Sequence, residues 1–179
     1  MRSLKELKQD ILSDDWKTAL AASDALAQIG GKAALDILLP LLSSPASWTR
    51  NAAALGLRDI GDNAAVEPLV HAISALGPQD DRGTLVYALQ SLDCSRQFRF
   101  LFDLTLCDVF ELQNHALAIL KEQEFQYAQA DITEAQDKLD IYGRRKDRPA
   151  GTDLLIRDLQ VLLDHLRTED SDTLQQCPA

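Results

Sequence analysis

The stretch RNAAALGLRDIGDNAAVEPLVHAI, residues 50–73, decides the fold of this 179-residue chain. Ala53 and Leu57 are one helical turn apart, within a run whose apolar residues recur at helical spacing, so the first half predicts an amphipathic helix. Gly61 ends that helix, because glycine readily takes the left-handed conformation found at helix C-termini. Asp62 can accept backbone N–H bonds at the start of a second helix. The stretch therefore predicts two helices joined by a tight turn.

The same pattern recurs along the chain. A copy begins at Trp16, the next begins at Trp48, and the two tryptophans are 48 − 16 = 32 residues apart. A third copy begins at Asp81, and a more divergent fourth copy begins at Phe110. Repetition at such a period is typical of stacked units that cannot bury their apolar faces alone. We therefore expect about four helical hairpins in series.

The third copy contains a local conflict. The stretch QFRFLFDLTL, residues 97–106, begins with the alternation of apolar and polar residues that is typical of a strand. Phe98, Leu101 and Phe102 nevertheless lie on one face of a helix. A single strand among helices would leave its backbone N–H and C=O groups unpaired. The position within the repeat therefore favours a helix.

The string RNAAALGLRDIGDNAAVEPL, from Arg50 to Leu69, resembles HEAT repeats, specifically the short bacterial type related to phycobilin lyases. It is echoed from Thr18 to Leu42, and the resemblance covers residues 13 to about 125. The resemblance implies a right-handed α-solenoid. Its first helices would line the convex side and its second helices the concave side, where partners commonly bind.

The C-terminal part of the chain has a different character. Residues 152–167 predict an amphipathic helix with a leucine stripe, which either caps the last repeat or forms a short dimerisation seam. Residues 169–179 are polar and predict a disordered tail. The fold class is thus all-α: an α-solenoid of about four HEAT-like hairpins plus a C-terminal capping helix, in one domain over residues 1–168.

The charge of the chain limits its partners. The sequence has 18 basic and 28 acidic residues, which gives a net charge of −10. Such a chain repels phosphate backbones, so we expect no nucleic-acid partner, and it would be steered toward a basic protein. We also expect no membrane segment, because no apolar run approaches the ~20 residues needed to cross a bilayer. The charged N-terminus lacks a secretory segment and indicates a cytoplasmic protein.

The residue types that carry chemistry are scattered. His71, His115 and His165 lie in distant segments, and the spacings of the cysteines match no metal or disulfide framework. Cys94 and Cys107 are interpreted as core or loop residues. The sequence shows no phosphate-binding loop and no nucleophile motif. We therefore predict no catalytic residue, no metal site and no cofactor.

Several charged groups have structural interpretations. The acidic pairs 14–15 and 80–81 precede first helices, where they would cap helix N-termini. Arg50 and Arg82 occupy equivalent positions and would form ion pairs with aspartates in adjacent turns. The basic stretch GRRKDRPAG, residues 143–151, is either a solvated loop or a contact for an acidic partner or a nucleic acid, and the net charge of −10 argues against the nucleic acid.

A candidate partner-binding surface follows from aligning the second helices. Successive repeats would present polar groups side by side, with a mixed arginine and phenylalanine end. The alternative is an ordinary solvated face. Arginine and aromatic residues often dominate binding energy at interfaces, and the candidate residues are Asp36, Glu67, His71, Arg96, Arg99, Phe100 and Asp103.

The sequence therefore predicts a non-catalytic protein-binding module, a scaffold or adaptor, that uses a concave face. Its partner would be another protein, possibly basic, and the chain itself would be a monomer or a weak dimer through the C-terminal helix. One alternative is a bacterial immunity protein that neutralises a basic toxin. A chromophore lyase or isomerase is implied only by the resemblance to phycobilin lyases. A helical-repeat DNA glycosylase is disfavoured by the acidic candidate surface.

Overall fold

The computed structural model describes residues 2–77 and 80–175, with side chains described to residue 168. Within these ranges the chain is helical and contains no β-strand. It divides into two compact units, Met1–Cys94 and Ser95–Ala179, hereafter unit 1 and unit 2. The predicted all-α class is confirmed.

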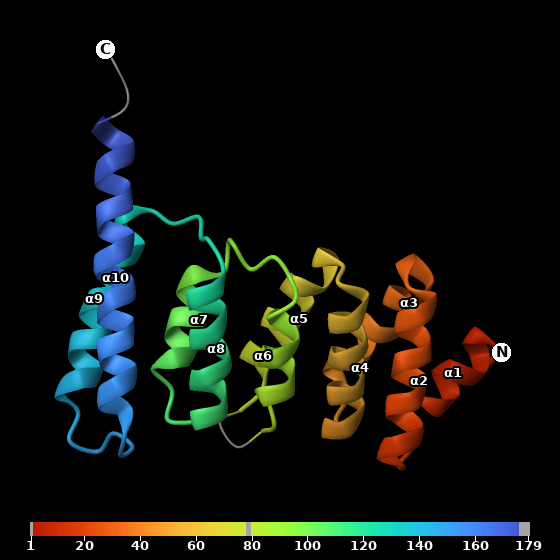
Figure 1. The fold of residues 1–179 in the computed structure, drawn as a ribbon. Helices are drawn as coiled ribbons and strands as arrows, with labels where there is room; N and C mark the ends of the chain where they lie inside the picture. Colours follow the sequence, from red (N-terminus) through yellow and green to blue (C-terminus); the bar gives the residue numbers. More distant parts are fainter. Residues whose placement is uncertain (1, 78–79, 176–179) are drawn as a thin grey trace. The chain divides into compact units, whose positions relative to one another are not determined.

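Unit 1 consists of helical hairpins (Figure 1). Two short 3₁₀ segments flank second helices: η1 follows α3, and η2 leads into α5. Contacts join α2 to α4 and α4 to α6, so the first helices of successive repeats pack on one another. The elements of unit 1 are α1 (Leu4–Asp10), α2 (Trp16–Ile29), α3 (Gly31–Leu38), η1 (Leu39–Ser43), α4 (Ser47–Ile60), η2 (Asn63–Ala65), α5 (Val66–Ala75) and α6 (Gly83–Leu89).

Unit 2 consists of two helical hairpins. Helix α7 packs on α8 and α9, and α9 packs on α10. Residues 97–106 thus form a helix rather than a strand, as predicted, with Phe98 and Phe102 buried in the core. The elements of unit 2 are α7 (Phe98–Thr105), α8 (Phe110–Glu122), α9 (Gln129–Arg144) and α10 (Thr152–Gln175).

Small residues let α2 and α4 approach closely. Ala19 and Ala22 on α2, together with Ala52 and Ala53 on α4, are fully buried. The hydroxyl of Ser23 crosses the interface and donates a hydrogen bond of 2.5 Å to the carbonyl oxygen of Ala52. The alanine-rich pattern of the repeat therefore serves helix–helix contact as well as helix formation.

The turns of the first two repeats confirm the sequence interpretation. Gly61 follows α4 with φ 69° and ψ 21°, the left-handed conformation that ends a helix. The Asp62 carboxylate accepts the Ala64 N–H at 2.9 Å and caps η2. Pro40 lies at the start of η1, where the α-helical hydrogen-bond pattern of α3 gives way to a 3₁₀ turn, since proline lacks the N–H that an α-helix requires.

Some predicted caps and ion pairs differ in the structure. Asp15 caps α2 through the Thr18 N–H, but Asp80 accepts the Gly77 N–H and Asp81 accepts the Asn51 side-chain amide, so neither aspartate caps α6. The predicted ion pair of Arg50 is also wrong. Its guanidinium donates to the carbonyl oxygens of residues 44 and 45 at 2.8 and 3.1 Å, because the preceding turn brings those oxygens closer than any carboxylate.

The single domain predicted over residues 1–168 stays a prediction, and the structure describes the chain as two compact units that meet between α6 and α7. The disordered tail predicted over residues 169–179 also stays a prediction, and α10 extends to Gln175. Extending an existing helix is easier than starting one. Residues 176–179 lie outside the described part of the chain.

We expect Gly56→Ala to destabilise unit 1. A Cβ atom at this position would lie well inside contact distance of Ser23 Oγ and 3.1 Å from Leu38 Cδ1. Overpacking costs about 1–3 kcal/mol, and the gain in helix propensity returns about 1 kcal/mol. Urea unfolding followed by circular dichroism should show a free energy of unfolding lower by up to about 2 kcal/mol.

The matched control is the double variant Ser23→Ala/Gly56→Ala. Removing Oγ relieves the closer of the two contacts, while the Ala52 carbonyl stays within the helical hydrogen-bond pattern of α4. The double variant should therefore be more stable than Gly56→Ala alone. If Gly56→Ala alone were more stable than the natural sequence, close helix packing at this point would be excluded.

Candidate functional site

The seven residues predicted to bind a partner fall into two groups. Asp36 lies on α3, and Glu67 and His71 lie on α5, all in unit 1. Arg96, Arg99, Phe100 and Asp103 lie on α7 or directly before it, in unit 2. Three of this second group, Arg96, Arg99 and Phe100, line one basin, and that basin is the candidate site. The predicted alignment of the two groups along one surface stays a prediction.

The candidate site is an open basin of about 430 Å³ beside the N-terminal end of α7. The Arg96 side chain is exposed, Phe100 is half-buried and Phe98 is buried. The basin thus combines a cation with aromatic surface, within reach of solvent. Its lining residues are Arg96, Gln97, Phe98, Arg99, Phe100, Gln126, Ala128 and Asp131.

One wall of the basin is the connection between α8 and α9. The Gln126 N–H donates to the Ser95 carbonyl oxygen at 2.7 Å. The rings of Phe125 and Tyr127 each lie 5.9 Å from the Phe98 ring, centre to centre. The alternation of aromatic and polar residues in this segment therefore turns its aromatic rings toward Phe98 and leaves Gln126 exposed. These contacts fix a wall that would otherwise be a free loop.

A group of ion pairs, hereafter the α7–α9 clamp, holds the two helices beside the basin. Arg99 pairs with Asp131 and lies 3.7 Å from Glu134. Lys138 pairs with Asp103 at 2.7 Å and with Glu134 at 2.9 Å. A single exposed ion pair contributes little, but five groups that share partners restrain one another. Asp131 also accepts the Ala128 N–H at 2.7 Å, at the start of α9.

The clamp shifts the pKa values of Asp131, Glu134 and Lys138. The Ala128 N–H and then Arg99 hold the pKa of Asp131 below its ordinary value of 3.8. Lys138 lowers the pKa of Glu134 from its ordinary 4.5, and Asp103 raises the pKa of Lys138 above 10.5. Each of these three shifts favours the charged form of the group concerned.

The arrangement gives different roles to the predicted residues. Arg96 makes no hydrogen bond or ion pair with the described part of the chain, so its guanidinium is available to a ligand. Arg99 and Asp103 are occupied by the clamp, which suits a positioning role. Sequence reasoning missed Asp131, Glu134 and Lys138 on α9. Their spacing of three and four residues places them on one helical face, and that spacing was the available signal.

The unit 1 residues show less organisation. Asp36 pairs with Lys32 on its own helix at 2.8 Å. Glu67 is exposed in the first turn of α5, and His71 is exposed on the same helix. Exposed pairs within one helix contribute only a few tenths of a kcal/mol, roughly, to stability. None of these three residues lines the basin beside α7.

The remaining reactive groups lie outside the basin. Cys94 is buried, and burial raises the pKa of its thiol to about 12, so it stays protonated. Cys177 lies outside the described residues. Among the residues that the structure describes, no three His, Cys, Asp or Glu side chains are grouped so as to hold a metal ion. No helix in those ranges is both long and apolar enough to cross a bilayer.

The clamp makes the stability of unit 2 depend on pH. Asp131 and Glu134 have lower pKa values in the folded chain than in the unfolded chain. Their contribution to the free energy of unfolding is therefore present above about pH 4.5 and is lost as the pH falls through the lowered values. Asp131→Asn/Glu134→Gln should therefore be less stable than the natural sequence near neutral pH, and the difference should shrink toward about pH 3. Urea unfolding at several pH values measures this.

Asp137→Asn, which removes an exposed carboxylate on α9 outside the clamp, is the control. Its unfolding should follow that of the natural sequence at every pH. A stability difference for the clamp variant that stayed constant down to about pH 3 would contradict an electrostatic role for these carboxylates.

Comparison with known proteins identifies the repeat. A family model described as HEAT repeats matches residues 4–90. No curated protein matches the chain significantly. The relation to phycobilin lyases stays a prediction. HEAT repeats generally act as protein-interaction scaffolds. Residues 4–90 include the hairpins of unit 1, so this part of the chain consists of HEAT repeats.

Proposed function

We propose that this chain is a non-catalytic protein-binding module, a scaffold or adaptor, whose contact site is the basin beside α7. The observation that carries the proposal is that Arg96 and Phe100 line the same basin, and that this basin already exists in the free chain. The HEAT repeats of the same chain support a protein as the ligand.

The composition of the basin suits protein recognition. Arginine offers five N–H donors in a planar fork, and phenylalanine offers a large apolar surface. Both are enriched among residues that dominate binding energy at interfaces. A basin of about 430 Å³ can receive one or two side chains of a partner. We expect a carbonyl or carboxylate of the partner at Arg96 and an apolar side chain on Phe100.

The preformed walls reduce the cost of binding. Ordering a loop or a rotamer-rich side chain costs about 0.5–1.5 kcal/mol per group. Here the aromatic contacts of Phe125 and Tyr127 fix one wall, and the α7–α9 clamp fixes the helix that carries Phe100. The net charge of −10 would speed the approach of a basic partner. The partner would thus be basic overall and present one acidic or carbonyl group to Arg96.

The test compares two baits in affinity purification from the native host. We expect Arg96→Ala/Phe100→Ala to lose a protein that the natural sequence retains. With that protein purified, calorimetry should show a Kd at least about tenfold higher, since two interface anchors are removed. Arg144→Ala/Ile141→Ala removes an exposed arginine and an exposed apolar residue elsewhere in unit 2, and this control should bind normally.

Circular dichroism of both variants separates loss of binding from loss of fold. Equal affinity of the natural sequence and the Arg96→Ala/Phe100→Ala variant for the purified partner would show that the basin is not the contact site. Turnover of a small molecule by the purified chain, with no protein partner recovered, would reject the binding module itself.

A further inference from the structure

Helix α10 has a second apolar face besides its packed one. Leu159, Leu163 and Leu166 are buried, which accounts for the side that packs on α9. On another side, Leu154 and Val161 are 56% and 64% exposed. These two residues are seven positions apart, so they lie on one side of the helix about 10 Å from each other. A terminal helix that only capped the repeats would present polar residues there.

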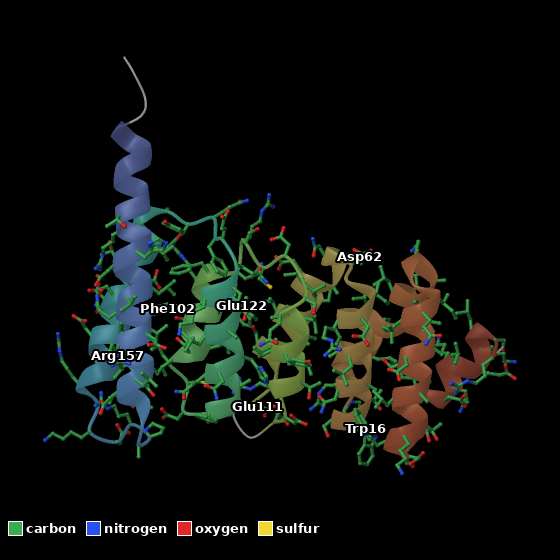
Figure 2. All side chains as sticks on the ribbon, viewed as in Figure 1. Trp16, Asp62, Phe102, Glu111, Glu122 and Arg157 are labelled. Atoms are coloured by element: carbon green, nitrogen blue, oxygen red, sulfur yellow. The ribbon has the colours of Figure 1, made fainter. Side chains whose placement is uncertain are left out.

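Charged residues stand between the two exposed apolar ones. Arg157, labelled on α10 in Figure 2, is exposed and makes no ion pair or hydrogen bond with the described part of the chain. Asp158 is three-quarters buried and pairs with Lys121 of α8 at 2.7 Å. Read along the helix, the face is apolar at 154, basic at 157, acidic at 158 and apolar at 161. We call these four residues the α10 face.

The apolar surface continues onto α8. A groove of about 410 Å³ runs between the two helices and includes Leu154 and Asp158 of the α10 face. From α8 it includes Leu117 and Phe110, and the Phe110 side chain is 77% exposed. A helix laid along the α10 face would therefore also cover Phe110, which is the most exposed of the large apolar residues described.

We propose that the α10 face binds the same face of a second copy of this chain, with the two α10 helices antiparallel. In this arrangement Leu154 of one copy lies opposite Val161 of the other. Arg157 of each copy lies opposite Asp158 of the other, since the two-fold axis passes between positions 157 and 158. The face is thus complementary to itself, as a two-fold interface requires.

Charge selects this orientation. In a parallel pair, Arg157 would meet Arg157 and Asp158 would meet Asp158, and like charges in contact disfavour association. The antiparallel pair joins opposite charges twice. Asp158 can keep Lys121 while it accepts Arg157 of the second copy, because a carboxylate offers about four acceptor positions. The α10 face spans only two helical turns, so the dimer dissociates on dilution.

The first test measures association of the full chain by sedimentation velocity over about 1–200 µM, the range in which a small interface associates. We expect a shift from monomer to dimer as concentration rises. Leu154→Asp and Val161→Asp should each raise the Kd at least about tenfold. Ile141→Asp alters an equally exposed apolar residue on α9 and should leave the Kd unchanged.

The second test determines orientation by disulfide trapping in a Cys107→Ser/Cys177→Ser background. A chain with Leu154→Cys mixed with a chain carrying Val161→Cys should form a disulfide-linked dimer on mild oxidation. Each chain alone should not, because equivalent positions are about 10 Å apart in the antiparallel pair and a disulfide needs Cα atoms within about 7 Å.

The outcomes are distinct. Concentration-dependent dimers that Leu154→Asp disrupts, together with trapping of the mixed chains, support the proposal. A monomer throughout the concentration range overturns it and leaves the α10 face to a different protein. A dimer that Ile141→Asp disrupts equally, or one in which Leu154→Cys traps itself, also overturns it. Circular dichroism of each variant excludes unfolding as the cause.

Discussion

Burial of the apolar side of each hairpin by its neighbour is the constraint on which this structure depends. Its tightest point in unit 1 is the contact of α2 with α4, where Gly56 leaves room for Ser23 and the Ser23 hydroxyl reaches the Ala52 carbonyl. A hairpin with such small residues cannot enclose its leucines alone. Stacking removes them from water, and α4 and α6 repeat the arrangement one hairpin further along.

Unit 2 buries the apolar sides of its hairpins with larger residues. Its core contains Phe98 and Phe102 of α7, and the segment between α8 and α9 adds two more rings. Bulkier side chains leave a less regular surface than alanines do, and the basin beside α7 is part of that surface. The α7–α9 clamp then holds the helix that carries Phe100. Phe98 thus contributes both to the core of unit 2 and to the lining of the basin.

The corrected expectations have a shared cause. The repeat position of Arg50 predicts an ion pair, yet its guanidinium donates to a backbone carbonyl oxygen of the preceding turn. The repeat position of Asp81 predicts a helix cap, yet its carboxylate accepts the side-chain amide of Asn51. Sequence spacing identifies neighbours within one helix. It does not identify neighbours across a turn or between helices. For the same reason Asp131, Glu134 and Lys138 were missed, although their spacing on α9 was visible.

The sequence by itself determined the helical class, the repeat and the main turns, because periodicity, Gly61 and Pro40 act through local backbone geometry. It also identified Arg96 and Phe100 as candidate contacts by residue type. Only the tertiary structure decided that these two share a basin, that Arg99 and Asp103 are held in a clamp, and that α10 keeps an exposed apolar face. Each of these features depends on contacts between side chains that are distant in the sequence, and those contacts are determined by the packing of one helix on another.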